Sequence, residues 1–487
     1  MQFCSLQFLI FLFLFLLIYF LVPKKIRKYW LLIANFLFYL SWDYKYVIIL
    51  MLIIVVSYLT GFFISKAQKK KPILIAGITS CLLILISFKY SRMLYEGFHE
   101  IMHINIDVMK DFILPIGISF YTFMAISYMI DVYRDRDVCE KNICIYMLYL
   151  SFFPYILCGP IERSKHMFTQ FRNLDKEKVF NYERITSAGL LFVWGCFQKL
   201  VISERLSLLV DEVFQNYHKY GATAVITAVI MYSIQIYCDF SSYSNIAIAI
   251  SKLIGIDIMN NFSTPYFSRN IAVFWRRWHI SLSSWIRDYL YIPLGGNRCG
   301  KFRKYMNTLL VFMISGLWHG ANITYIVWGF LHGIYQIISN VVRPVKQKIE
   351  KTCKFRIDTF GYHLFEIIIT YLFVCIAWLF FRANSITQAV DMLVRIVTRW
   401  DPWSLFDQSI YTWGLDRNEF GIAVIAILVL LIVDLIKYKH QNEIISLIKK
   451  QPILFRWLIY IALIAAVIVL GEYGPDFNAH NFIYTAY

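Results

Sequence analysis

Long apolar stretches recur along the whole chain, each close to the length that a membrane-crossing helix needs. The hydrocarbon core of a bilayer requires about 20 consecutive apolar residues in a helix, and the first stretch is LQFLIFLFLFLLIYFLV. No long polar region interrupts the series, so we expect one integral domain over residues 1–487, an all-α polytopic membrane protein with about twelve spanning helices. The candidate spans lie near residues 5–22, 29–42, 45–65, 73–89, 112–131, 187–202, 222–238, 305–319, 322–340, 364–381, 420–436 and 454–471.

The basic residues between these stretches predict the side on which each connection lies, because cytoplasmic loops are enriched in Lys and Arg. Clusters such as 24–28, 66–71 and 346–356 fall inside if both chain ends lie outside. The cluster 24–28 follows the first apolar run, and no small-residue cleavage site accompanies that run, so we expect a retained helix rather than a signal peptide.

Three segments break this alternation, since a full crossing by the first of them, or by both of the other two, would place basic connections outside. They are residues 145–165, 238–256 and 272–296. We expect these segments to be partial or re-entrant. Irregular backbone at membrane depth survives only where protein buries it or where it lines a watery cavity, so the three segments predict a protein-enclosed polar chamber.

Composition supports a membrane protein and argues against a soluble globular protein and a nucleic-acid-binding protein. The chain is 59% hydrophobic and 16% charged, with a mean hydropathy of +0.57, which an ordinary soluble globule does not reach. The net charge of +17 lies in connections rather than in a basic domain with a nucleic-acid motif, so we expect no nucleic-acid partner. The ten cysteines show no paired CxxC spacing, and we expect neither a metal site nor a disulfide framework. Four of them lie in apolar runs and are expected to behave as small hydrophobic residues: Cys81, Cys196, Cys238 and Cys375.

His319 is the strongest single candidate for function. It lies in SGLWHGANITYIVWGFLHG between two apolar runs, and a titratable group at that depth is costly and therefore a functional candidate. A histidine that only joins two helices through a backbone hydrogen bond fits this segment equally well. His332, on the second run, is expected to be structural.

The densest polar segment is FWRRWHISLSSWIRDYLYIPLGGNR, which contains Arg276, Arg277, His279 and Arg298 among aromatic residues. Arginines flanked by aromatic side chains suit the headgroup level and either anchor the protein there or bind the phosphates of lipid or of an acyl donor. Acyl transfer from a thioester to a hydroxyl needs a base and hydrogen-bond donors for the oxyanion. His279 and His319 are the pair that would supply such chemistry.

Carboxylates inside the apolar segments are few. Asp131 and Asp239 lie at predicted span ends, where we expect them to cap a helix or to pair with a cation.

Five motifs in order along the chain carry a resemblance to a known family. The chain resembles the bacterial membrane-bound O-acyltransferase family, and within it the alginate O-acetyltransferase branch, with the branch that transfers D-alanine toward teichoic acids as a relative. Five motifs in the same order are far more specific than any one of them. They are LPIGISFYTFMAISYMIDVYR (114–134), PYILCGPIER (154–163), QIYCDFSSYSNIAIA (235–249), FWRRWHISLSSWIRDYLYIPLGGNR (274–298) and GLWHGANITYIVWGFLHG (316–333).

The resemblance implies helices around a funnel in the bacterial cytoplasmic membrane, where a cytoplasmic acyl donor meets an outer acceptor. It assigns the family's invariant histidine to His319 and a second, supporting histidine to His279. The implied donor is acetyl-CoA or an acyl group on phosphopantetheine, with no tightly bound cofactor. The implied partners are membrane lipids, a polysaccharide acceptor often reached through an extracytoplasmic SGNH-type protein, and in the related branch an acyl-carrier protein. Residues expected to bind donor or substrate are Arg276, Arg277, Arg298, Trp318 and Asn322.

Two alternatives stay open at this stage. D-alanyl transfer from a carrier protein shares the motifs, although the additional sequence around residues 385–420 and the wording of the motifs favour the acetylating branch. A transporter is the alternative of another class, since broken helices and buried polar groups also line transport paths.

Overall fold

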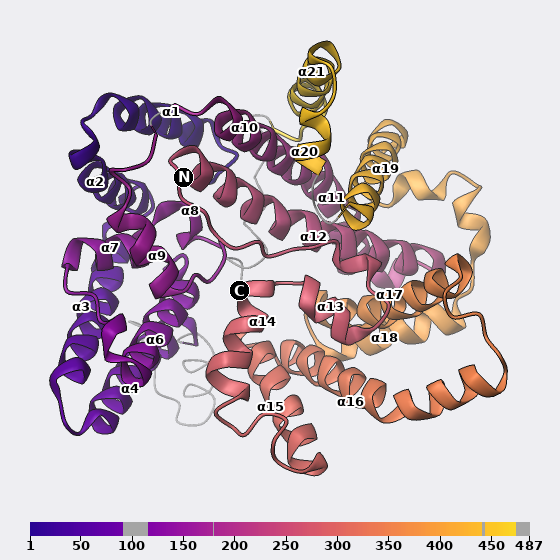
Figure 1. The fold of residues 1–487 in the computed structure, drawn as a ribbon. Coiled ribbons are helices and arrows are strands. Elements are labelled where there is room, and N and C mark those ends of the chain that lie inside the picture. Colours follow the sequence, from indigo (N-terminus) through magenta and orange to yellow (C-terminus); the bar gives the residue numbers. More distant parts are fainter. Residues whose placement is uncertain (91–114, 179, 441–443, 474–487) are drawn as a thin grey trace, which may run out of the picture. The chain divides into compact units, whose positions relative to one another are not determined.

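The computed structural model describes residues 1–90, 115–178, 180–440 and 444–473. In these ranges every regular element is a helix, which confirms the all-α prediction (Figure 1). Two compact units divide the chain: the first comprises residues 1–192 and 243–260, and the second residues 193–242 and 261–487. That they fold as one integral domain stays a prediction.

The first unit is built from the N-terminal helices, among which α3, α4 and α6 lie side by side (Figure 1). It also contains most of α10 and the C-terminal part of α12, which belong to both units. Its helices are α1 Leu6–Leu21, α2 Arg27–Leu40, α3 Tyr44–Lys66, α4 Lys70–Lys89, α6 Ile118–Arg134, α7 Ile143–Ser151, α8 Phe153–Ile156, α9 Ser164–Arg172, α10 Tyr182–Cys196 and α12 Ala222–Leu253.

The second unit carries the C-terminal helices and two π-helical turns, Phe197–Ser203 and Arg287–Tyr291. Its remaining helices are α11 Glu204–Gln215, α13 Ile271–Arg277, α14 Ile280–Ile286, α15 Lys301–His319, α16 Ile323–Thr352, α17 Phe360–Arg382, α18 Ile386–Thr398, α19 Arg417–Lys439, α20 Ile444–Lys449 and α21 Ile453–Leu470.

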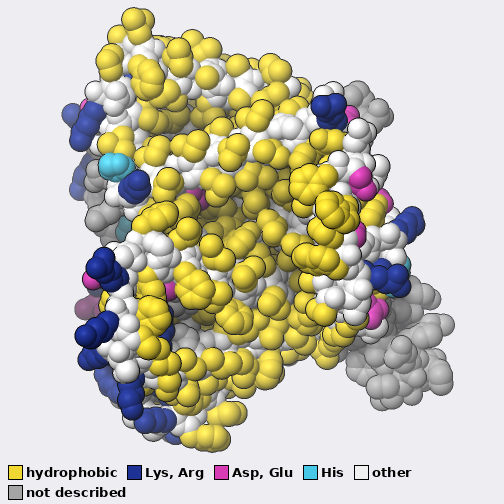
Figure 2. All heavy atoms as spheres, turned by 90° about the vertical axis from the view of Figure 1, so that its right-hand side faces the viewer, with side chains coloured by type: hydrophobic (Ala, Val, Ile, Leu, Met, Phe, Trp, Pro, Cys, Tyr) yellow, Lys and Arg dark blue, Asp and Glu magenta, His cyan; other side chains and the backbone are white. Residues whose placement is uncertain are grey.

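Eight helices in the described part of the chain are long and apolar enough to cross a membrane: α3, α4, the continuous run 182–215, α12, α16, α17, α19 and α21. Many of their large apolar side chains are exposed, as Leu454 and Val469 on α21 show. Figure 2 shows apolar side chains over most of one face, with Lys and Arg gathered along its margins. A surface of this kind is stable against lipid and not against water. The protein is therefore a multi-pass membrane protein.

The other four expected spans also form helices, but these are shorter or carry charge. Helices α1, α2 and α6 have 16, 14 and 17 residues, and α15 begins with a basic turn at Lys301. The expected span 112–131 starts in residues outside the described ranges. Helix α6 is buried along most of its length, so protein rather than lipid covers it.

Two of the three segments expected to be irregular are broken. Residues 145–165 form α7 and the single turn α8 before an extended stretch, and residues 272–296 form α13, α14 and a π-helical turn. The expectation for residues 238–256 is wrong, because α12 runs through them to Leu253 without interruption. Two of its serines find partners within the protein: Ser242 Oγ donates to Asp239 O at 2.6 Å, and Ser241 Oγ accepts from Gln198 Nε2 at 2.7 Å. Such bonds lower the cost of burying polar side chains on an unbroken helix.

Helices α15 and α16 pack backbone against backbone, and glycines make this possible. A Cβ on Gly316 would lie 2.1 Å from Tyr325 O, and one on Gly329 would lie 2.2 Å from Phe312 O. Small residues at helix crossings allow such close approach in membranes. The crossing brings the last turn of α15, which ends at His319, against the first turns of α16.

Candidate active site

His319 is the last residue of α15 and is almost fully enclosed, with 4% of its surface exposed. Aromatic rings line it. Its ring centroid lies 4.9 Å from that of Trp318, 5.1 Å from Trp328 and 5.2 Å from Phe381. The imidazole is thus held at the junction of α15, α16 and α17 in surroundings that contain little water. Such surroundings strengthen any electrostatic interaction made there.

His279 begins α14 and carries a strained backbone, with φ at +43°. This left-handed conformation is unfavourable for a non-glycine residue and persists only where its surroundings impose it. The ring is buried and meets Phe240 edge-on at a centroid distance of 4.6 Å. Strained residues cluster at functional sites, so the backbone of His279 supports its candidacy independently of its side chain.

Asn261 holds the strained turn and was not predicted from the sequence. Its carbonyl oxygen accepts from Ile280 N at 3.0 Å, and its Oδ1 accepts from Ser281 Oγ at 2.6 Å and from Ser281 N at 3.3 Å. These bonds fix the two residues that follow His279. In the sequence Asn261 stands among other polar loop residues, and nothing local distinguishes it.

The Trp318 ring lies close to both His319 and His279. Its ring centroid lies 4.9 Å from His319 and 6.2 Å from His279. The structure therefore brings together three of the predicted site residues in one aromatic cluster of the second unit. Their catalytic and binding roles stay predictions.

The three predicted arginines lie in different surroundings. Arg277 donates to Phe267 O at 3.2 Å, and its guanidinium stacks over the Tyr438 ring at 5.1 Å. Arg276 and Arg298 are exposed. Two of the three predicted phosphate-binding cations thus face outward, while the third is engaged by groups of the protein.

The side-chain oxygen and nitrogen of Asn322 both form hydrogen bonds to nearby backbone groups. It precedes α16, where its Oδ1 accepts from Thr324 N at 3.0 Å and caps the helix. Its Nδ2 donates to Asn384 O at 2.8 Å. These bonds fix the short connection after His319, and its predicted contact with substrate stays a prediction.

A buried ion cluster occupies the second unit near the π-helical turn Phe197–Ser203. Lys199 Nζ lies 2.6 Å from Asp239 Oδ1 and 2.8 Å from Glu204 Oε1, and all three side chains are buried. A π-helical turn closes on every fifth residue, which lets Lys199 and Glu204 meet. Asp239 pairs as predicted, although it lies in the middle of α12 rather than at a helix end.

The four cysteines expected to act as small hydrophobic residues, Cys81, Cys196, Cys238 and Cys375, are all buried and carry free thiols.

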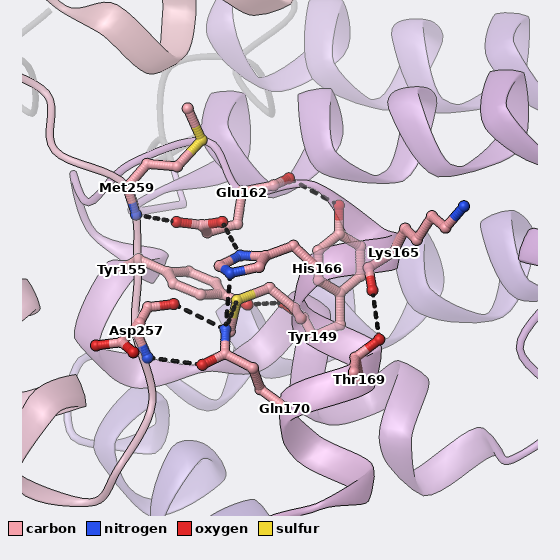
Figure 3. A network of polar contacts seen from close by, with 10 residues as sticks. Tyr149, Tyr155, Glu162, Lys165, His166, Thr169, Gln170, Asp257 and Met259 are labelled. Atoms are coloured by element: carbon pink, nitrogen blue, oxygen red, sulfur yellow. Dashed lines mark hydrogen bonds and ion pairs between the residues drawn. The ribbon is translucent and has the colours of Figure 1, made fainter.

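The first unit contains a separate polar network around Glu162, drawn in Figure 3. Glu162 is fully buried; its Oε1 accepts from Met259 N, and its Oε2 lies 3.3 Å from His166 Nδ1. Gln170 clamps Asp257 by accepting from its N–H at 2.7 Å and donating to its C=O at 2.8 Å (Figure 3). The network ties α9 to the segment that follows α12.

Comparisons with known proteins agree with the motifs. Residues 1–383 match the model of the membrane-bound O-acyltransferase family. The chain is 34% identical over 444 residues to a probable alginate O-acetylase of Pseudomonas aeruginosa, covering 89% of this chain and 82% of that protein. It is 32% identical over 397 residues to a peptidoglycan O-acetyltransferase of Helicobacter pylori, covering 76% and 73%.

A more distant similarity links the chain to a teichoic acid D-alanyltransferase of Streptococcus thermophilus. The identity is 30% over 251 residues, covering 49% of this chain and 60% of that protein. The family match spans most of the chain and includes both histidine-bearing motifs. The chain therefore belongs to the membrane-bound O-acyltransferase family and is a multi-pass membrane acyltransferase.

Proposed function

We propose that this enzyme moves an acetyl group from a cytoplasmic thioester to a hydroxyl group of a polysaccharide outside the membrane. The observation that carries the proposal is the placement of His279 and His319 close to the same Trp318 ring. The names of two similar proteins, an alginate O-acetylase and a peptidoglycan O-acetyltransferase, support acetyl as the group and a glycan as the acceptor.

His319 acts as the general base or orients the acceptor hydroxyl. As the hydroxyl oxygen bonds to the thioester carbon, its proton passes to the imidazole; the carbon–sulfur bond then breaks, and the proton leaves with the thiol. The products are an ester and a free thiol. His279 positions or polarises the thioester, and the bonds from Asn261 to the two residues that follow keep its backbone in the strained conformation. Holding both reactants in the right geometry supplies a large part of such a rate enhancement.

The donor is acetyl-CoA or an acetyl group on phosphopantetheine, and both carry phosphate. The exposed Arg276 and Arg298 are suited to attract those phosphates, since a guanidinium pairs with phosphate through two parallel hydrogen bonds. Arg277, engaged by Phe267 and Tyr438, positions the end of α13 beside them. The acceptor reaches the site directly or through an extracytoplasmic SGNH-type partner.

The test incubates membranes that contain the protein with isotope-labelled acetyl-CoA and candidate glycans, alginate and peptidoglycan among them. Native protein should label a glycan, and His319→Ala at equal abundance should not. Undiminished labelling by His319→Ala would reject the role of His319.

D-alanyl transfer is the second candidate function, favoured by the similarity to the teichoic acid enzyme. A parallel reaction with labelled D-alanyl carrier protein separates the two. Label in teichoic acid, with none from acetyl-CoA in any glycan, would replace the acetyl proposal.

A further inference from the structure

His332 on α16 is completely buried and surrounded by aromatic side chains, and the reaction outlined above does not use it. Its ring centroid lies 5.0 Å from that of Trp275 and 5.1 Å from that of Trp328. The Phe274 ring is almost parallel to it, at 6.1 Å. Burying an imidazole costs free energy unless both of its ring nitrogens find hydrogen-bond partners.

One hydrogen bond determines the tautomer of this ring. Trp275 Nε1 donates to His332 Nδ1 at 3.2 Å. An indole nitrogen is only a donor, so His332 Nδ1 must be unprotonated, and the neutral ring carries its hydrogen on Nε2. Among the described residues no acceptor lies within hydrogen-bond reach of that buried Nε2–H.

A second donor of the same kind lies one turn earlier on α16. The buried Nε1–H of Trp328 also has no acceptor among the residues that the structure describes. Four residues apart on a helix, Trp328 and His332 project from the same face. Buried donors in native proteins almost always have a partner, so two such donors on neighbouring rings, 5.1 Å apart between centroids, point to an oxygen that is not part of the protein.

The Trp328 ring lies next to both His319 and His332. The Trp328 ring centroid lies 5.1 Å from that of His319 and 5.1 Å from that of His332. The two imidazoles can thus be no farther apart than these two separations combined. A separation within that limit can accommodate a hydroxyl, an acyl carbon and its oxygen, with hydrogen bonds to His319 at one end and to a donor at the other.

We propose that His332 Nε2–H, together with Trp328 Nε1–H, donates to the acyl oxygen of the thioester as it becomes an oxyanion, and that Trp275 holds His332 in the required tautomer. The inference rests on the proposed acyl transfer. When the acceptor oxygen bonds to the carbonyl carbon, the carbonyl electron pair moves onto that oxygen. It returns when the carbon–sulfur bond breaks and the thiolate takes the proton from His319. Pre-oriented donors stabilise this transient charge.

The competing role for His332 is structural, in which only its bond with Trp275 matters. A matched pair of substitutions separates the two roles. In His332→Gln the amide nitrogen takes the place of Nε2 and can donate to the acyl oxygen, whereas in His332→Asn the amide takes the place of Nδ1 and can only preserve contact with Trp275.

We expect His332→Gln to keep activity within about fivefold of native, and His332→Asn to lower kcat about 100-fold with little change in KM, as for removal of one oxyanion donor. Thermal unfolding in detergent confirms that both variants are folded. Equal activity of the two variants, or higher activity of His332→Asn, would overturn the inference.

A double-mutant cycle keeps the test decisive if His332→Asn does not fold. Trp275→Phe removes the indole N–H and frees the His332 tautomer, so we expect a lower kcat. In the His332→Gln background the same change should cost nothing, because an amide donor has no tautomer to fix. Equal losses in both backgrounds would assign Trp275 a packing role and reject the inference.

Failure of the inference can be told apart from failure of the proposed function. If native protein transfers acetyl and His319→Ala does not, while the His332 variants behave alike, only the inference fails. If native protein transfers no acetyl group, the proposed function itself fails.

Discussion

Histidine occupies two very different settings in this enzyme. In the first unit His166 is half-exposed and faces the Glu162 carboxylate, whereas in the second unit His332 is enclosed by aromatic rings and accepts a hydrogen bond from an indole. The first ring can gain a proton with a carboxylate beside it to balance the charge. The second must be unprotonated at Nδ1 to accept that bond, so protonation would break it.

The contrast shows that burial, rather than residue type, decides how much a polar group contributes to stability. Water competes with a half-exposed pair and screens it, so the pair changes stability little. An enclosed group must find its partners within the protein or in a substrate. Leaving it without a partner costs much stability. The four predictions that follow test this difference, beginning with the largest effect.

The buried ion cluster gives the largest effect. Lys199→Met leaves Asp239 and Glu204 buried without their cation, and we expect a loss of about 3–5 kcal/mol in unfolding free energy. Thermal unfolding in detergent measures it. The triple variant Lys199→Met, Glu204→Gln, Asp239→Asn should recover much of the loss, because it removes all three charges.

The matched control for this cluster is Glu177→Gln in the first unit. Glu177 is half-exposed and lies 3.4 Å from Arg184, so its loss should cost less than about 1 kcal/mol. Equal losses of unfolding free energy at the two sites would show that buried and exposed ion pairs do not differ in the expected way.

The close crossing of α15 and α16 gives the second effect. Gly329→Ala would place a Cβ 2.2 Å from Phe312 O, and since a backbone atom must move, we expect destabilisation of about 1–3 kcal/mol together with lower activity. Gly421→Ala on α19 is the control, because nothing lies within 4 Å of the added carbon. That change should be neutral or slightly stabilising through helix propensity. If Gly329→Ala left stability unchanged, the two helix backbones would not pack as closely at Phe312 as the structure indicates.

The strained turn at His279 gives the third effect. Asn261→Ala removes the acceptor for Ser281, and we expect kcat to fall about tenfold, equivalent to 1.4 kcal/mol, with KM almost unchanged. If Asn261 acts through that bond, Ser281→Ala should add less than its single effect in the Asn261→Ala background. Asn340→Ala, at an exposed position on α16, serves as the control. If the losses of kcat in the two single variants simply add in the double variant, Asn261 does not position His279 through Ser281.

The Glu162–His166 pair gives the smallest effect. The hydrogen bond to Glu162 raises the pKa of His166 above its usual 6.5, with a further contribution from Asp257. Its stabilisation should be fully present below pH 6.5 and should disappear as pH rises through the raised pKa. Because the side chain is half-exposed, we expect roughly 0.5 kcal/mol or less. Unfolding temperatures of native protein and His166→Gln between pH 5.5 and 8.5 measure it; a native-specific gain at high pH would contradict the sign.

Much of the fold followed from the sequence, because apolar length and positive charge report on the membrane directly. The broken segments around residues 145–165 and 272–296 were predicted from charge alone. The break expected at residues 238–256 was not found. There Gln198 pairs with Ser241, a partner that the local sequence does not reveal.

The site was predicted less completely than the fold. His319, His279 and Trp318 were named as candidates from their motifs, and the structure brings their rings together. Asn261 and the tautomer of His332 depend on contacts with residues far along the chain, such as Ser281 and Trp275. No local pattern encodes such pairings.

The most direct test of the account compares acetyl transfer by His319→Ala and His166→Ala in membranes with labelled acetyl-CoA and a glycan acceptor. We expect His319→Ala to lose at least about 100-fold in rate, as for removal of a general base, and His166→Ala to stay within about threefold of native. If His319→Ala retained its rate, or if His166→Ala lost as much while folded, the chemistry would not lie in the aromatic cluster.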